Sequence, residues 1–491
     1  MAGLAAVLGV AAAVLLVAVW AVRVSARLGL PSLLLYLGIG LVLGVIGIRY
    51  DNAQLTQYLG TAALVLILTE GGLTTRWSTV RSSLGLGVVL STVAVLVSIL
   101  ATGLLLHVLL DLDWRTAMLW GSVLSSTDAA AVFSVLRGVH VSRRLSGALE
   151  LESGLNDAPV YLAVILLAGT DPLTWQTPLV VAYELVVGAI IGMALGWGGG
   201  WLLRHAALPA TGLYPLATFA VCVLAFTGGT LAHASGLLAT YVCALRLGNS
   251  HLPHRANTLS FAEGMGWMAQ IGLFVLLGLF ATPSQLVVDL IPGLIAGAVL
   301  VFVARPLSVL IAATPFRVPW RQQAFLSWAG LRGAVPIVLA LIPLSEGRPN
   351  ADHLVSAVFV LVVVLTLVQG GTLPWVARML GLAQGSSQPE ELEVDSAPLD
   401  ELRAGLLQVR IQPGSKLHGV YLYELRLPVG AVVSLVVRKD QGFTPDSRTR
   451  LQQGDQLLVV ATDAVREATE RRIRAVDRAG RYAKWKGEKG T

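Results

Sequence analysis

The chain has 491 residues, of which 55% are apolar and 13% are charged, and its mean hydropathy is +0.73. These values exclude an ordinary soluble globular protein and indicate a membrane protein that crosses the bilayer several times. The net charge of +6 does not indicate nucleic-acid binding, because the arginines of the first 380 residues lie in short loops between apolar segments.

Charged residues divide the chain into two parts. Residues 1–380 contain 18 Arg, no Lys and 14 acidic residues, whereas residues 381–491 contain 17 basic and 15 acidic residues. We therefore predict a transmembrane domain over residues 1–382 and a small cytosolic α+β domain over residues 403–480. A polar linker over residues 383–402 and a basic tail over residues 481–491 complete the predicted organisation.

Apolar stretches of about 17–25 residues are long enough to cross a bilayer as helices. Residues 1–20 have no basic region and continue into a full span, which predicts a membrane helix rather than a cleaved signal peptide. The all-α membrane domain is predicted to have about thirteen spans, near residues 3–22, 29–48, 57–75, 84–108, 115–136, 149–169, 178–203, 212–232, 235–249, 258–281, 285–312, 324–344 and 354–379.

Arginines in the loops indicate the orientation of these spans. One set of alternate loops contains 14 arginines, Arg305 among them, and the other set contains Arg49, Arg115 and Arg348. By the positive-inside rule the arginine-rich loops are cytoplasmic, so the N-terminus is predicted outside and the C-terminal domain inside the cell. This orientation requires an odd number of spans.

An odd number of spans is compatible with two inverted repeats. If spans 1–6 and 8–13 correspond, the site is expected at broken helices in matching positions of the two halves. Span 5 is interrupted by "SSTD" at 125–128, whose side chains compete for backbone hydrogen bonds. Span 12 contains Gly330, Gly333 and Pro336, and proline cannot donate to the helix ladder. We therefore predict two broken helices, in spans 5 and 12, that cross near the middle of the membrane.

Polar residues also interrupt the sixth span, in "ELESGLNDAPV" at 150–160. On a helix, Glu152, Ser153, Asn156 and Asp157 share one face. A carboxylate beside hydroxyl, amide and carbonyl oxygens is a hard ligand set that suits a small cation. The sequence therefore predicts a cation site on this face of the sixth span.

Two residues of the break in span 5 are predicted to approach this site. Asp128 would complement a helix N-terminus, and the loosened carbonyl of Thr127 would attract a cation. Asp128 could cap the helix or touch the ion. Asn156 could be a ligand or a donor that holds the unwound backbone, and we favour the donor.

Ionised side chains at mid-bilayer cost about 2.5–3.5 kcal/mol each, so some of them must pair. Because we place Arg332 as the only basic residue within a span, we predict an ion pair between Glu152 and Arg332. Asp157 then remains to hold either a proton or a cation, and this competition, coupled to alternating access, gives antiport. Since no intramembrane lysine can carry a second proton, we expect electroneutral 1:1 exchange.

Three motifs, "SSTDAAAVFSVLRG" (125–138), "ESGLNDAPV" (152–160) and "WAGLRGAV" (328–335), carry a resemblance to a known family. In order and spacing they resemble the bacterial sodium (potassium)/proton antiporters of the cation/proton exchanger superfamily. The resemblance covers nearly all of residues 1–380. It implies a thirteen-helix fold with dimer and core subdomains, and hence a homodimer. The Asn-Asp pair is typical of the electroneutral branch.

The same resemblance assigns roles to residues of this chain. It implies that Asp157 binds the cation and the proton, with Ser153, Thr127 and Asp128 around it, and that Glu152–Arg332 is a structural ion pair. Glu70, in span 3, matches an acidic position that lies near the ion in some members. Glu70 and Glu263, in span 10, are candidates for the ion pathway, although a purely structural role is open for both.

The C-terminal part reads as a strand, short helix, strand, strand and helix. The strands are expected at "LLQVRI" (406–411), "GAVVSLVVRK" (430–439) and "DQLLVVAT" (455–462), and the helix at 463–476. This order resembles the C-terminal half of potassium-conductance regulator domains, the TrkA-C type. The resemblance implies dimerisation and a small regulatory ligand. The basic tail is expected to lie on anionic lipid.

The predicted function is exchange of cytosolic potassium for protons across the inner membrane, tuned by the cytosolic domain and serving pH and volume homeostasis. Sodium is the alternative ion. We predict no enzyme activity, no nucleic-acid partner, no cofactor and no metal beyond the transported ion, with membrane lipid as the surroundings. A cation channel would need a filter of repeated carbonyl sequences, and we find none. An intramembrane hydrolase using Asp128 and Asp157 would leave Asn156 without a purpose.

Overall fold

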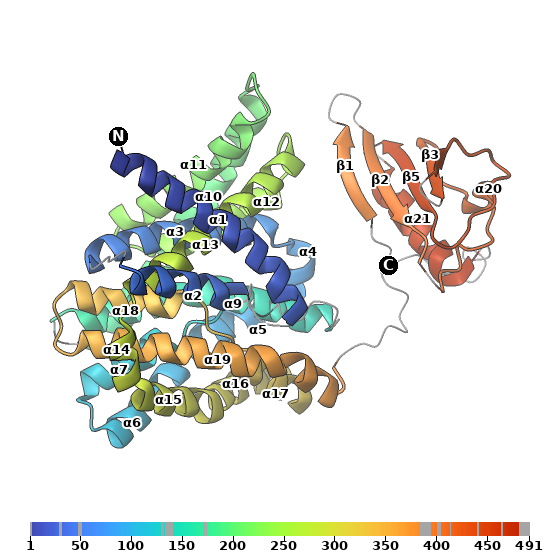
Figure 1. Ribbon diagram of the computed structural model, residues 1–491. Coiled ribbons are helices and arrows are strands. Elements are labelled where there is room, and N and C mark those ends of the chain that lie inside the picture. The colour runs from blue at the N-terminus through green and yellow to red at the C-terminus, as the bar shows by residue number, and fades with distance from the viewer. Residues whose placement is uncertain are drawn as a thin grey trace. The chain divides into compact units, whose positions relative to one another are not determined.

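The computed structural model contains two compact units, Met1–Ala383 and Gln384–Thr491, which are shown in Figure 1. The first unit is helical and the second is built on a sheet. The described residues are 2–28, 32–47, 52–128, 132, 141–170, 172, 174–382, 394–399, 404–412, 414–438, 441–462 and 465–480.

Helices make up the first unit, and each of the thirteen predicted spans contains at least one of them. In the first half they are α1 (Ala2–Leu28), α2 (Ser32–Val45), α3 (Ala53–Thr74), α4 (Trp77–Val80), η1 (Arg81–Ser83), α5 (Leu84–Val89), η2 (Leu90–Ala94), α6 (Val95–Leu110), α7 (Trp114–Leu124) and α9 (Arg143–Ala168). The second half contains α10 (Thr177–His205), α11 (Leu213–Leu231), α12 (Gly236–Gly248), α13 (Arg255–Phe280), α14 (Pro283–Val288), α15 (Leu290–Val299), η3 (Leu300–Ala304), α16 (Arg305–Ala313), η4 (Thr314–Phe316), α17 (Trp320–Trp328), α18 (Val335–Ser345) and α19 (Ala351–Met379).

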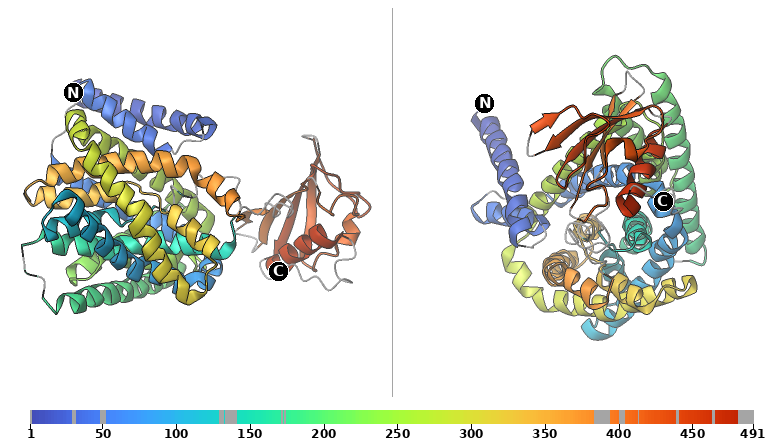
Figure 2. Two further views of the ribbon diagram at one scale, coloured as in Figure 1. Left: turned by 90° about the horizontal axis from the view of Figure 1, so that it is seen from below. Right: turned by 90° about the vertical axis from the view of Figure 1, so that its right-hand side faces the viewer.

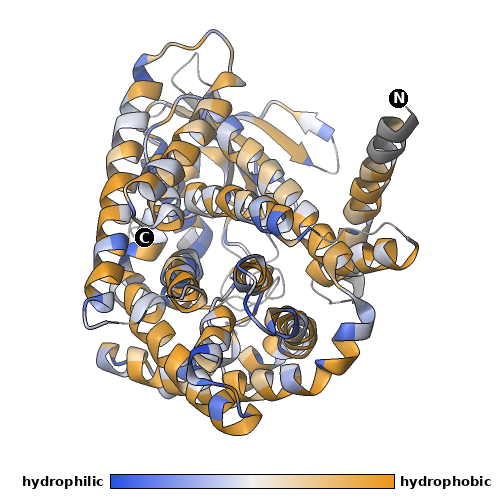
Figure 3. Ribbon diagram, turned by 90° about the vertical axis from the view of Figure 1, so that its left-hand side faces the viewer, coloured by the Kyte–Doolittle hydropathy of each residue, from blue (hydrophilic) through white to orange (hydrophobic). Residues whose placement is uncertain are grey.

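The length and composition of these helices fit a membrane. Within the described part of the chain, seven continuous helical runs are long and apolar enough to cross a bilayer, and four shorter apolar helices accompany them. The fold class is as predicted, whereas the exact number of thirteen spans stays a prediction. Figure 3 shows hydrophobic residues along most of the helices.

The long helix α10 has one face suited to lipid and one face packed against another helix. One face exposes Val186, Ile190 and Trp197, as lipid requires. The opposite face carries glycines at every fourth position, and at Gly192 an added Cβ would lie 2.3 Å from the carbonyl oxygen of Ala239 on α12. Small residues at this spacing let two membrane helices approach closely. Figure 2 shows the packing of the first unit from two further sides.

Two helical runs contain a π-helical segment. The run 77–110 contains η2, and the run 290–316 contains η3. These runs are the fourth and eleventh predicted spans, seven apart. The contacts are also reciprocal, because η2 packs against α16 while η3 packs against α6. This reciprocity supports the predicted inverted repeat, and such π-segments often occur at functional sites.

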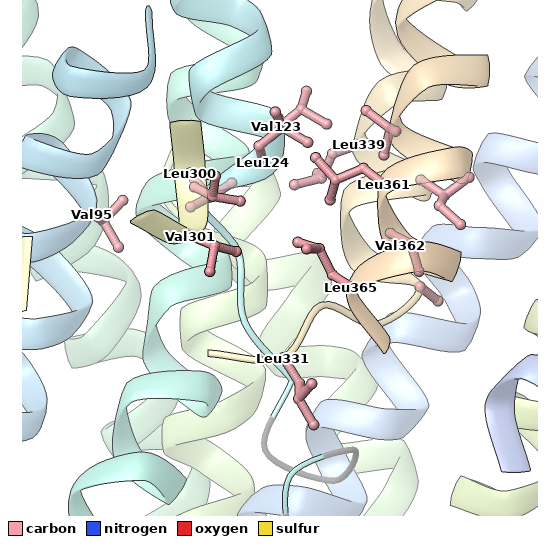
Figure 4. Close-up of a cluster of buried hydrophobic side chains, with 14 of the residues drawn as sticks. Val95, Val123, Leu124, Leu300, Val301, Leu331, Leu339, Leu361, Val362 and Leu365 are labelled. Carbon is pink, nitrogen blue, oxygen red and sulfur yellow. The ribbon is translucent and has the colours of Figure 1, made fainter. Parts of the chain in front are cut away.

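A cluster of buried apolar side chains lies between helices of the first unit (Figure 4). Val95 of α6, Leu124 of α7 and Leu300 of η3 are buried together with Leu339 of α18 and residues of α19. Helix α9 lies among α5, α7, η2, α12 and α18. The polar residues of α9 are therefore enclosed by protein and not by lipid.

The second unit is a five-stranded antiparallel sheet with the order β1-β2-β5-β3-β4. Leu407, Val459 and Val436 are buried on one face with Ile473 and Val476 of α21. The elements are β1 (Val394–Leu399), β2 (Ala404–Arg410), α20 (Leu422–Leu425), β3 (Ala431–Arg438), β4 (Gln441–Phe443), β5 (Gln456–Thr462) and α21 (Arg466–Ala479).

The structure corrects the linker prediction in one place. Residues 383–402 were predicted to be a linker, but β1 lies within this range and pairs with β2 from Val394↔Val409 to Leu399↔Ala404. The acidic and proline residues of this segment suggested a linker. An edge strand tolerates both residue types, so they do not exclude a strand. The rest of the linker and the basic tail 481–491 lie outside the described residues.

Candidate ion-binding site

Two broken helices cross beside α9. Helix α7 ends at Leu124, and residues 126–128 are not helical. Helix α17 ends at Trp328, and α18 begins at Val335. The two breaks are joined through the backbone, because the Asp128 amide donates to the carbonyl of Leu331 over 2.9 Å. Both interruptions predicted from the sequence are present, and they meet.

Asp157 lies on α9 at this crossing. Its side chain is buried, and the Ser126 hydroxyl donates to Asp157 Oδ1 over 2.7 Å. A hydroxyl that donates to a carboxylate stabilises the ionised form and can turn to offer an oxygen to a cation. Ser126 was missing from the predicted site. It lies in the quoted motif, but nothing in the sequence distinguishes its orientation from that of Ser125.

Two residues of α9 donate hydrogen bonds to Thr127. The Ser153 hydroxyl donates to the Thr127 carbonyl over 2.7 Å, and the Asn156 amide donates to the Thr127 hydroxyl over 2.6 Å. Asn156 therefore acts in this state as the donor that fixes the unwound segment. The Asn156 Oδ1 atom is buried without a hydrogen-bond partner among the described residues, so it is available to a ligand.

Asp128 lies against the second break. A Cβ added at Gly333 would overlap the Asp128 carboxylate, so the absence of a side chain at position 333 makes room for that carboxylate. Asp128 also lies close enough to Asp157 for the two charges to interact. Ser126, Thr127, Asp128, Ser153, Asn156 and Asp157 thus converge on one small region where α9 meets the crossing.

The structure gives Glu152 a partner other than the predicted one. Its carboxylate lies 2.5 Å from Arg305 Nη1, and both side chains are buried. The prediction chose Arg332 because Arg305 was assigned to a cytoplasmic loop. In the structure Arg305 lies inside the helical run 290–316 and is only 5% exposed.

Arg332 is nevertheless part of the same cluster. It is fully buried, within range of the charges of Arg305 and Glu152, and its Nε and Nη1 atoms have no hydrogen-bond partner among the described residues. Arg305 also donates to the Leu326 carbonyl over 3.2 Å, which attaches it to the end of α17. Two buried guanidinium groups therefore share one buried carboxylate next to the candidate site.

A cavity of about 230 Å³ leads to Asp157. It begins at exposed Thr74, at the end of α3, and reaches buried Asp157 and Thr127. The remaining polar lining residues are Glu70, Thr75, Asp128, Glu150, Ser153, Tyr241 and Gln270. The cavity can therefore hold water or a cation from the mouth to the carboxylate of Asp157.

The two candidate pathway residues differ in position. Glu70 lines the cavity and packs against Gly266, where an added Cβ would lie 2.9 Å from its side chain. Glu263 is exposed and does not line the cavity, although its charge is near that of Glu70. The structure therefore connects Glu70 with the route to Asp157, and Glu263 only with Glu70.

A second, larger cavity of about 620 Å³ lies at the other end of α9. It is lined by Leu167 near the end of α9, Trp120 of α7 and His353 of α19, and Asp157 is not among its lining residues. Near this cavity Arg115 and Arg348 both donate to the Gly169 carbonyl and so cap the C-terminus of α9. Among the described residues, the cavity at Thr74 therefore reaches Asp157, and the larger cavity lies at the C-terminal end of α9.

Comparison with protein families agrees with this geometry. Residues 12–379 match the model of the sodium/hydrogen exchanger transmembrane family, and residues 406–474 match the TrkA-C domain. The order of the two domains is the one that the sequence predicted.

Named relatives and a solved structure extend the comparison. A protein of Alkalimonas amylolytica named K(+)/H(+) antiporter NhaP is 38% identical over 79% of this chain and 68% of its own length. One of Shewanella baltica named K(+)/H(+) antiporter NhaP2 is 35% identical over 90% of this chain and 79% of its own length. The structure of the sodium proton antiporter MjNhaP1 from Methanocaldococcus jannaschii matches with a TM-score of 0.67 at 20% identity, covering 77% of this chain and 99% of that one. The chain therefore belongs to the sodium/hydrogen exchanger family of membrane proteins and carries a C-terminal TrkA-C domain.

Proposed function

We propose that this protein exchanges one monovalent cation for one proton across the bacterial inner membrane, with Asp157 as the shared binding group. The observation that carries the proposal is the position of Asp157. It is the buried carboxylate at the inner end of the cavity, and its hydrogen-bond partner is the Ser126 hydroxyl and not an arginine. A carboxylate in this setting can lose its proton to a cation and regain it.

Charge supports an electroneutral cycle. Guanidinium groups stay protonated, so neither Arg305 nor Arg332 can carry a proton in the exchange. Asp157 bears one positive ligand in each loaded state, either a proton or a cation. The net charge around Asp157 is then the same in the proton-loaded and in the cation-loaded state. One cation is therefore exchanged for one proton.

The two cavities support alternating access. In this structure Asp157 is reached from the Thr74 end, and we assign that end to the cytosol because the arginine-rich loops lie there. Movement of α9 with the crossed breaks would close this cavity and connect Asp157 with the cavity at Leu167. The fixed hydrogen bonds among Ser153, Asn156 and Thr127 would let α9 and the first break move together.

Potassium is the proposed cation, because relatives that match at 34–38% identity are named K(+)/H(+) antiporters, and two of them align with 90% and 91% of this chain. Sodium is the second candidate. A protein of Synechocystis named Na(+)/H(+) antiporter NhaS2 is 30% identical over 72% of this chain. We also propose a homodimer, and a small ligand that acts through the TrkA-C domain.

Proteoliposomes with an internal pH dye test the proposal. The wild type should move protons against an imposed gradient of potassium, more slowly against sodium or lithium, without a sustained current. Asp157→Asn should abolish exchange and keep the gel-filtration profile of the wild type, because the amide cannot release a proton. Normal turnover in folded Asp157→Asn protein would refute the assignment of Asp157.

A further inference from the structure

The cavity contains a second polar cluster, nearer its mouth than Asp157. Glu150 lies seven residues before Asp157 on α9, which places the two carboxylates on one helix face about 10 Å apart along the axis. Both line the cavity, and Ser153 and Gly154 lie between them.

Thr75, at the end of α3, joins this cluster. Its hydroxyl oxygen lies 2.6 Å from Glu150 Oε1 and 2.8 Å from the Gly71 carbonyl oxygen. A hydroxyl has one proton and can donate to only one of these acceptors. When the hydroxyl donates to the Gly71 carbonyl, a proton on Glu150 or a cation that bridges the two oxygen atoms would stabilise the short contact with Glu150 Oε1. The contacts of Thr75 therefore favour a proton or a cation beside Glu150.

Tyr241 supplies an independent sign of a missing ligand. Its side chain is 2% exposed and lines the cavity, and its hydroxyl makes no hydrogen bond of normal geometry among the described residues. Its polar neighbours are Thr75 and Glu150. A buried hydroxyl without a partner is costly, so a bound water or cation would stabilise this arrangement.

No basic residue among the described residues forms an ion pair with Glu150. Arg76, exposed at the end of α3, is close enough to attract Glu150, but the two form no ion pair within 4.0 Å among the described residues. Glu70, one turn before Thr74 on α3, adds a second negative charge to the same cavity. The mouth is thus negative and lined with oxygen atoms, which are the ligands that alkali cations prefer.

We propose that Glu150, Thr75 and Tyr241 form a staging site for the alkali cation, which the cation occupies before it displaces the proton from Asp157. The staging site rests on the proposed exchange function and adds a residue that sets apparent affinity. Glu150 raises the local concentration of the cation at the mouth of the cavity. It takes no part in the exchange itself, so its loss should change the Michaelis constant more than the maximal rate.

The test measures initial exchange rates in proteoliposomes as a function of potassium and sodium concentration at fixed pH. Glu150→Gln should raise the Michaelis constant about tenfold, the size expected for the loss of one charged ligand, with a maximal rate close to that of the wild type. Tyr241→Phe removes only the hydroxyl and should raise the constant less. Glu150→Asp keeps the charge and should restore most of the affinity. Glu346→Gln, at an exposed glutamate outside the cavity, is the matched control and should behave as the wild type.

Each outcome decides between the two proposals. An unchanged Michaelis constant in Glu150→Gln, or a lower maximal rate alone, overturns the staging site while exchange through Asp157 stands. If Glu150→Gln does not fold, the staging site is overturned when both Glu150→Asp and Tyr241→Phe have the Michaelis constant of the wild type. Exchange that survives Asp157→Asn in the same vesicles is a different result, because it contradicts the proposed function itself.

Discussion

Glu152 and Asp157 lie five residues apart on α9, and their surroundings give the two carboxylates different tasks. Glu152 faces Arg305 at 2.5 Å, with Arg332 nearby, so we assign it a structural role. Asp157 faces hydroxyl groups and a cavity, so its positive ligand can be exchanged. The elements that pack against each side of α9 therefore make the difference between the ion pair of Glu152 and the proposed exchange site at Asp157.

The hydrogen bond from Ser126 to Asp157 leads to a prediction at the scale of single residues. Ser126→Ala removes a donor to the ionised carboxylate and an oxygen atom next to the cation. Because a hydrogen bond to a charged group contributes about 1.5–3 kcal/mol, the apparent cation affinity should fall at least about tenfold at fixed pH. Ser122→Ala, on the same segment but bonded to the Met118 carbonyl, is the control and should keep its affinity. Equal affinities in the two variants would exclude Ser126 from the site.

The Glu152 cluster predicts an asymmetric loss of stability. Arg305→Met leaves Arg332 to balance Glu152, whereas Glu152→Gln leaves two buried guanidinium groups without a counter-charge. Removing one partner of a buried pair costs about 3–5 kcal/mol, so both variants should melt earlier in detergent, and Glu152→Gln should melt earliest. The double variant should recover part of the loss. If Arg305→Met melts like the wild type, the ion pair of Glu152 lies elsewhere.

The residues of the site show what a single sequence can and cannot reveal. Asp157, Ser153, Asn156, Thr127 and Asp128 converge as predicted, since helical spacing and a broken span are readable patterns. Arg305 and Ser126 were not found. Whether an arginine near a span end lies in a loop or within a helix depends on tertiary packing, and the orientation of a hydroxyl depends on which helix crosses it.

At the scale of elements, the crossing requires a residue without a side chain at position 333. Gly333→Ala would place a Cβ on the Asp128 carboxylate and push the two breaks apart. Exchange should be lost or strongly reduced, although alanine is the better helix former. Gly371→Ala, on α19 where an added Cβ meets no atom within 4 Å, is the matched control and should be fully active. Equal activity of the two variants would contradict the crossing.

The elements themselves differ in how far the sequence predicted them. The breaks in spans 5 and 12 were predicted, because "SSTD" and Pro336 leave a direct signature. The π-segments η2 and η3 carry no such signal, since Leu300–Ala304 is wholly apolar and Leu90–Ala94 contains only Ser91 and Thr92 as polar residues, without glycine or proline. Strand β1 was read as linker because its partner strand β2, and not its own composition, holds it in the sheet.

At the scale of the whole molecule, the boundary at Ala383 separates the helical unit from the unit that is built on a sheet. Deleting residues 384–491 should leave exchange in proteoliposomes and change its dependence on pH or on cation concentration, because Asp157 and its cavity lie entirely in the first unit. Comparing both dependences in the truncated and full-length protein is the measurement. Identical profiles would mean that the second unit does not regulate exchange.

The second unit has a stability determinant of its own. Arg438 donates to both oxygens of fully buried Asp455 over 2.8 Å, and this hydrogen-bonded pair raises the pKa of Arg438. Asp455 also accepts from the Gln452 amide and thereby fixes the turn before β5. Arg438→Met should destabilise this unit by about 3–5 kcal/mol without stopping exchange, which hydrogen–deuterium exchange of β3 and β5 would detect. Unchanged protection there would contradict this role.

Competition between a proton and a cation for Asp157 is the centre of this account, and proton release on cation binding tests it most directly. Purified protein in weakly buffered detergent solution should release one proton for each potassium or sodium ion that binds at Asp157, which is the part of the calorimetric binding that Asp157→Asn abolishes. Folded Asp157→Asn protein should release none. Binding of the cation to the wild type without release of a proton would contradict the account.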